Sequence, residues 1–126
     1  MRLGPAARRG GAAATIQART VLQAFIRGIG NGDPTVCDRF ITVSYAGRAY
    51  GSMDMCRKDA VNVRERYRAH EVQAMRTTSV PRGSGSNGAV TVRFADLAWT
   101  SGHMTAETLR TQFVLRKMGD GWKIVA

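Results

Sequence analysis

The stretch TLRTQFVLRKMGDGWKIVA, residues 108–126, carries the clearest structural signal in the chain. Apolar side chains alternate with polar ones before the turn sequence Gly-Asp-Gly at 119–121, and the alternation resumes after it. A glycine-rich turn between two such segments is typical of a β-hairpin. We therefore predict a long strand over residues 104–118 that pairs with a final strand over residues 122–126.

Two more strands are predicted upstream of this hairpin. Residues 70–80 and 89–100 are interpreted as strands, and residues 81–88, which are rich in Gly, Ser and Asn, as the loop that joins them. The alternation changes phase within the second of these strands, and a β-bulge near Ala95-Asp96 would produce this change and bend the strand. The C-terminal half is therefore expected to form a curved antiparallel sheet.

Helical patterns occupy the N-terminal half. Apolar residues recur every three or four positions over residues 13–29, and a run of glycines is expected to end this helix. Asp33 and Pro34 open a short second helix, with Asp33 as the predicted N-cap. Residues 42–51 are interpreted as a loop or a broken turn, and residues 52–68 as a third helix. Its expected buried stripe consists of Met55, Cys56, Asp59, Ala60, Val63 and Tyr67.

Helices followed by a meander of strands indicate an α+β fold, with N-terminal helices packed on a curved antiparallel sheet. The chain has 126 residues, which suits one domain. Residues 1–12 consist mainly of Gly, Ala, Pro and Arg, and we expect a disordered basic tail there, followed by a single domain over residues 13–126. No apolar run is long enough to predict a transmembrane segment.

The net charge of +10 comes from sixteen Arg and three Lys residues set against nine acidic ones. The arginines are scattered along the chain, and aromatic residues do not interleave with them as stacking platforms for bases would. Specific nucleic-acid binding is therefore not expected. Weak, salt-sensitive attraction to polyanions is expected, and an Arg-rich polyanion-binding protein remains an alternative function.

Cys37 and Cys56 are the chain's cysteines. They form no CxxC motif and have no His at ligand spacing, so no metal site is expected. From the residues alone, the pair is either two buried free thiols or a disulfide. No motif for a cofactor is present either, because the glycines of GIGNG follow a predicted helix and not a strand.

Asp96 is the candidate catalytic residue, because apolar residues flank it on a predicted strand. If its carboxyl group points inward, desolvation would raise its pKa and suit it to proton transfer. The phase change near Asp96 could instead turn it outward. No His and Asp pair lies at a spacing that guarantees contact, so the sequence offers no acid–base partner for Asp96. This favours a non-catalytic role and leaves catalysis as the alternative. The candidates for lining a ligand cavity are Tyr45, Tyr50, Phe94, Trp99 and Phe113.

The order of these elements, and the terminal hairpin above all, resembles the nuclear transport factor 2-like (cystatin-like α+β cone) superfamily. The segment GNGDPTVCDRF at 30–40, followed by a second cysteine, is similar more narrowly to small exported or membrane-anchored members from actinobacteria. The resemblance covers residues 13–126. It implies a cone-shaped cavity, a disulfide between Cys37 and Cys56, and frequent homodimers through the sheet.

The resemblance does not imply a single function, because the superfamily holds enzymes and binding subunits alike. The leading hypothesis is a non-catalytic module that binds an apolar small molecule or a partner protein. The alternative is a small cavity enzyme, of the isomerase, dehydratase or polyketide cyclase type, that uses Asp96. The expected location is extracytoplasmic or membrane-associated if the N-terminus is incomplete, and cytoplasmic otherwise.

Overall fold

The computed structural model describes residues 3–86, 88–119 and 121–126, with side chains for residues 15–85, 88–119 and 121–126. In these residues six α-helices pack on a four-stranded antiparallel sheet, so the predicted α+β class is confirmed. The elements are α1 (Leu3–Gly30), α2 (Thr35–Phe40), α3 (Val43–Tyr50), α4 (Met53–Val61), α5 (Val63–Arg66), α6 (Ala69–Thr77), β1 (Ser84–Ser86), β2 (Ala89–Arg93), the 3₁₀ turn η1 (Phe94–Asp96), β3 (Gln112–Met118) and β4 (Gly121–Ile124).

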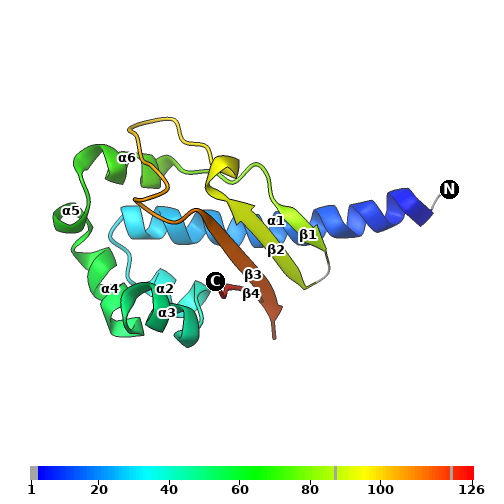
Figure 1. The fold of residues 1–126 in the computed structure, drawn as a ribbon, viewed down its shortest axis with the longest axis horizontal. Helices are drawn as coiled ribbons and strands as arrows, with labels where there is room; N and C mark the ends of the chain where they lie inside the picture. Colours follow the sequence, from blue (N-terminus) through cyan, green and yellow to red (C-terminus); the bar gives the residue numbers. More distant parts are fainter. Residues whose placement is uncertain (1–2, 87, 120) are drawn as a thin grey trace.

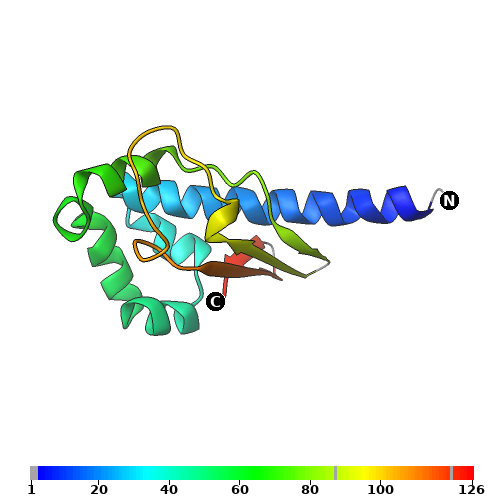
Figure 2. The same ribbon diagram turned by 45° about the horizontal axis from the view of Figure 1, so that its top comes forward.

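Helix α1 runs along one face of the sheet, and its N-terminal part projects beyond it (Figure 1, Figure 2). The helix begins at Leu3, within the segment 1–12 for which composition predicts disorder. Residues 1–2 of that tail lie outside the described residues, and its disorder in solution stays a prediction. The apolar face expected over residues 13–29 is buried, as its spacing predicts: Ala18, Leu22, Phe25, Ile26 and Ile29.

The glycines near the end of α1 allow other helices to approach it closely. The glycine run ends the helix as predicted, because Gly30 is the last residue of α1, while Gly28 lies within its last turn. A Cβ on Gly28 would overlap the Val36 side chain of α2, and a Cβ on Gly30 would lie 2.9 Å from Met75 Cβ of α6. Gly32, with a φ of 75°, then turns the chain.

Side-chain caps explain the short helices that follow. The Asp33 carboxylate accepts a hydrogen bond from the Thr35 backbone N–H at 3.0 Å, although Pro34 occupies the N-cap position predicted for Asp33. Thr42 caps α3 by accepting from Tyr45 N–H at 3.1 Å, so residues 42–51, interpreted as a loop, instead form a helix. The predicted helix over 52–68 is divided into α4 and α5 at its middle.

The predicted strand over 70–80 is wrong, because residues 69–77 form helix α6. The Glu71 side chain accepts a hydrogen bond from the Arg68 backbone N–H at 2.8 Å, which stabilises the first turn of a helix. Val72 and Met75, three residues apart, are buried on the side of α6 that packs on α1. Packing against α1 therefore determines the helical conformation of residues 69–77, and the alternation of apolar and polar residues does not.

The strands are shorter than the sequence predicts. Strand β2 ends at Arg93, and the 3₁₀ turn η1 replaces the predicted bulge near Ala95-Asp96, which accounts for the change of phase. Strand β3 begins at Gln112 instead of residue 104, and residues 104–111 form no strand. The short β1 lies inside the predicted loop over 81–88.

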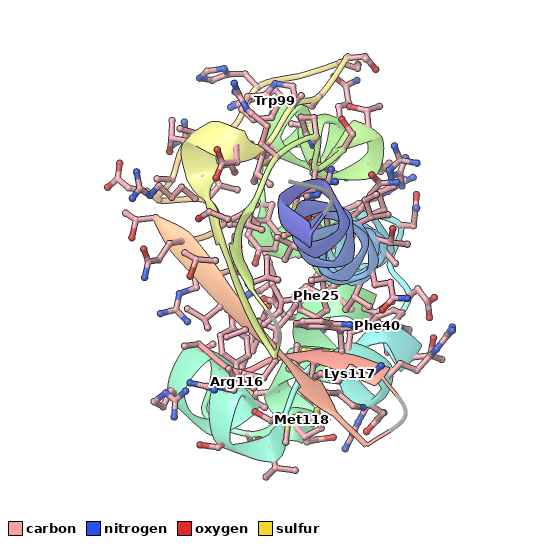
Figure 3. The ribbon with its side chains drawn as sticks, turned by 90° about the vertical axis from the view of Figure 1, so that its right-hand side faces the viewer. Phe25, Phe40, Trp99, Arg116, Lys117 and Met118 are labelled. Carbon is pink, nitrogen blue, oxygen red and sulfur yellow. A yellow bond between two sulfur atoms is a disulfide. The ribbon has the colours of Figure 1, made fainter. Side chains whose placement is uncertain are left out.

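The predicted C-terminal hairpin is present. Lys117 pairs with Trp122 and Met118 with Gly121, while Asp120 lies outside the described residues. The inner face of the sheet packs on α1 and closes one continuous core, to which it contributes Val90, Val92, Phe113, Leu115, Trp122 and Ile124. In Figure 3, Phe25 points from α1 into the space between the helix and the sheet. The labelled hairpin residues Arg116, Lys117 and Met118 lie toward one edge of the molecule.

A disulfide joins Cys37 of α2 to Cys56 of α4, with a Cα–Cα distance of 6.1 Å. Both cysteines are fully buried, and the pairing implied by the resemblance is confirmed. Helices α2 to α5 gather near the C-terminal end of α1 (Figure 1). Within the described residues, no helix is both long and apolar enough to cross a membrane.

Candidate ligand-binding cavity

A cavity of about 430 Å³ lies where the helices at the end of α1 meet the sheet. Helices α1, α3, α4 and α5, the segment before β3 and the first part of β3 all contribute to its wall. The lining residues are Phe25, Ile26, Ile29, Tyr45, Arg48, Ala49, Tyr50, Asp59, Arg66, Tyr67, Thr108, Leu109, Arg110 and Phe113. The floor is apolar, and the charged residues are arginines together with one aspartate.

Helix α3 supplies two of the three tyrosines. Thr42 fixes the start of this helix, and Gly51, with a φ of 97°, ends it directly after Tyr50. Tyr45 is 2% exposed. Among the described residues, neither the Tyr45 nor the Tyr50 hydroxyl group has a hydrogen-bond partner, and both residues line the cavity. Both hydroxyl groups are therefore free to bond a ligand.

Desolvation by burial raises the pKa of the Tyr50 hydroxyl well above its usual value. The Coulomb fields of Tyr45, Tyr67 and Asp59 act in the same direction, and the positive charge of Arg110 acts in the opposite one. Tyr50 consequently stays protonated at ordinary pH and keeps a hydrogen to donate.

The third tyrosine belongs to a hydrogen-bonded network around Asp59. Tyr67 donates its hydroxyl hydrogen to Asp59 Oδ2 at 2.8 Å, and Arg66 Nε lies 2.9 Å from Asp59 Oδ1. The Asp59 side chain is 3% exposed, so both of its oxygens are satisfied inside the wall. Burial raises the pKa of Tyr67, and the charge and hydrogen bond of Asp59 raise it further.

Arginines line the open side of the cavity. Arg48 donates to Ser44 Oγ at 2.9 Å and to the Val125 carbonyl oxygen at 2.5 Å. Arg66 is paired with Asp59. The guanidinium carbon of Arg110 lies 5.3 Å from the centre of the Tyr45 ring, within the range of a cation–π contact.

The segment that carries Arg110 is held in place by a side chain of α6. Thr108 donates from its hydroxyl group to Glu71 Oε2 at 2.6 Å. This hydrogen bond, followed by the one from the Arg68 backbone, lowers the pKa of Glu71. Although residues 104–111 form no strand, they are thus anchored to the rest of the fold beside the cavity.

The structure brings together three of the five residues predicted to line a cavity: Tyr45, Tyr50 and Phe113. Phe94 and Trp99 lie elsewhere, with ring centres 5.7 Å apart, and Trp99 also approaches His103 at 6.3 Å. Figure 3 places Trp99 at the opposite edge of the molecule from the hairpin. The start of β3 at residue 112, together with turn η1, moves this cluster away from the cavity.

Sequence reasoning did not single out Asp59, Tyr67 or the arginines as site residues. One signal was available, because Asp59 lies within the expected apolar stripe of the third helix. A carboxylate on a buried face needs partners, and those partners are candidates for a functional site.

Asp96 lies outside this cavity. It forms the last position of turn η1, where its Oδ2 accepts a hydrogen bond from the Arg93 backbone N–H at 2.9 Å. Its other oxygen lies 4.0 Å from Arg82 Nε. The structure therefore places Asp96 as a capping residue beside a second, shallow depression that also includes Arg19.

Across the described parts of the chain, no group of three or more His, Cys, Asp or Glu residues is placed to hold a metal ion. Comparison of the chain with protein-family models, with curated proteins and with solved structures finds no match. The assignment of function therefore depends on the cavity itself.

Proposed function

We propose that this chain is a non-catalytic binding module that holds a small, largely apolar ligand in the cavity between α1, α3 and β3. The observation that carries the proposal is an aromatic cavity wall in which the Tyr45 and Tyr50 hydroxyl groups have no hydrogen-bond partner among the described residues. The volume of about 430 Å³ falls within the range of about 300–1,000 Å³ that is usual for small-molecule sites.

The Asp59 network supports binding over catalysis. A general base needs a lone pair directed at the substrate, whereas Asp59 Oδ2 accepts a hydrogen bond from Tyr67 and Asp59 Oδ1 is ion-paired with Arg66. Asp96, the residue on which the enzyme hypothesis depends, has its oxygens directed at Arg93 and Arg82 and is not in the cavity wall. These placements favour Asp59 and Asp96 as structural residues.

We further propose an extracytoplasmic location. Disulfides persist mainly in oxidising compartments, and the Cys37–Cys56 bond is fully buried between α2 and α4. The proposed kinship with the nuclear transport factor 2-like superfamily is supported by the order of helices and strands and by a cavity that opens between them.

The proposal is tested by titrating ¹⁵N-labelled protein with octan-1-ol and following the backbone amide resonances. We expect the shifts to concentrate at cavity residues such as Ile29, Tyr50 and Phe113. Ala49→Trp, at an exposed position of the cavity wall, should fill the opening and abolish these shifts. Ala98→Trp, at an exposed position outside the wall, is the matched control and should leave them unchanged. Shifts spread evenly over the surface, or equal in all three proteins, would contradict the proposal.

A further inference from the structure

The charge of the cavity wall is unbalanced. Three arginines line it, at positions 48, 66 and 110, against the single carboxylate of Asp59. That carboxylate is already bonded to Arg66 and Tyr67. An apolar cavity needs no such excess of positive charge, and concentrated charge of one sign at an opening attracts ligands of the other sign.

Arg110 is the uncommitted member of the three. Arg48 is bonded to Ser44 and Val125, and Arg66 to Asp59, whereas the contact of Arg110 within the described residues is the face of the Tyr45 ring. Its side chain is exposed at the opening, so its hydrogen-bond donors remain available.

Tyr45, Tyr50 and Arg110 line the same cavity. Arg110 stacks on Tyr45, and its charge acts on the Tyr50 hydroxyl. A carboxylate has two oxygens in one plane, which suits the paired donors of an arginine, and it can also accept a hydrogen bond from a tyrosine. This end of the cavity therefore combines one cation with two neutral donors around an apolar interior.

We infer that the ligand is an amphipathic monocarboxylate, whose carboxylate is bound by Arg110 with Tyr45 and Tyr50 and whose apolar body lies toward Phe25 and Phe113. This inference rests on the proposed binding function and specifies the class of ligand. A cationic ligand would meet the net positive charge of the opening. A neutral one would leave the Arg110 guanidinium without a counter-charge.

The test compares octanoate with octanamide, which has nearly the same shape and no charge, by amide-resonance titration. Charge-assisted hydrogen bonds are about twice as strong as neutral ones, so we expect octanoate to bind about tenfold more tightly. Arg110→Gln should remove most of this preference, because it should weaken the binding of octanoate more than that of octanamide. The control is Arg116→Gln, at an exposed position on strand β3 outside the cavity wall, and it should keep the preference.

Equal affinities for octanoate and octanamide at the cavity would overturn the inference and leave the proposed function intact. A preference for octanoate that survives Arg110→Gln would overturn the role of Arg110. The absence of any cavity shift with octanoate, octanamide and octan-1-ol alike would instead contradict the proposed binding function itself. The spectrum of each variant reports in the same experiment whether it is folded.

Discussion

Asp59 is the residue on which the cavity wall depends most. A carboxylate that is 3% exposed is stable only while its oxygens have partners, and Tyr67 and Arg66 provide them from the segment that follows α4. The same contacts place the Tyr67 ring against the cavity. Stability and the shape of the site therefore depend on one network.

The network predicts unequal effects for two similar substitutions. Tyr67→Phe removes a donor from buried Asp59 and should lower the free energy of unfolding by about 1–3 kcal/mol. Tyr50→Phe removes a hydroxyl group that has no partner among the described residues and should cost less than about 1 kcal/mol. Urea denaturation of the two variants measures the difference, and equal losses would show that the Asp59 network does not contribute as described.

At the scale of the elements, helix α1 positions the others because glycines at its C-terminal end leave room for close approach. Gly28 and Gly30 bring α2 and α6 against α1, and α2 carries Cys37 of the disulfide. A helix interior normally favours Ala over Gly, so Gly28 is kept at a cost in helix propensity. In return, the absence of a side chain allows the helices to pack closely.

Gly28→Ala and Gly47→Ala test this explanation as a pair. Both positions are helical, yet a Cβ at Gly28 would overlap Val36, whereas at Gly47 nothing lies within 4 Å. We expect Gly47→Ala to stabilise the protein by about 0.5–1 kcal/mol. Gly28→Ala should destabilise it by about 1–3 kcal/mol, the usual cost of overpacking. Thermal unfolding of both variants provides the measurement, and stabilisation by Gly28→Ala would refute the close-approach argument.

How far the elements could be predicted depends on what fixes each one. The C-terminal hairpin was predictable because alternation and a glycine turn are local signals, and the first helix because its apolar spacing is regular. Helix α6 was not, because its segment owes its conformation to Glu71 and to packing on α1. The cavity was predictable only in part, since helix α3, which carries Tyr45 and Tyr50, begins at a threonine cap within an apparent loop.

At the scale of the whole molecule, the disulfide joins α2 to α4, the helix that contributes Asp59 to the cavity wall. Asp59 lies three residues after Cys56 on α4, so the bond holds the helix that carries the buried carboxylate. A cross-link acts mainly by restricting the unfolded chain, and a loop of this length is worth about 3 kcal/mol in that description.

The double variant Cys37→Ala/Cys56→Ala should accordingly lose about 2–4 kcal/mol of unfolding free energy. Because α4 then loses its covalent link to α2 and keeps only packing and the Arg57–Asp38 ion pair, amide hydrogen exchange should quicken in α2 and α4 more than in the β3–β4 hairpin. Hydrogen exchange followed by NMR provides the comparison between these regions. A loss of protection spread uniformly over the fold would indicate that the bond does not act locally on the cavity wall.

The most direct test of the central claim is a crystal structure of the protein with ω-bromooctanoate. The account predicts anomalous scattering from bromine inside the cavity, near Phe25 and Phe113, with the carboxylate at Arg110. Bromine found only on the outer surface, with the cavity unchanged, would contradict the claim that this chain binds its ligand between α1, α3 and β3.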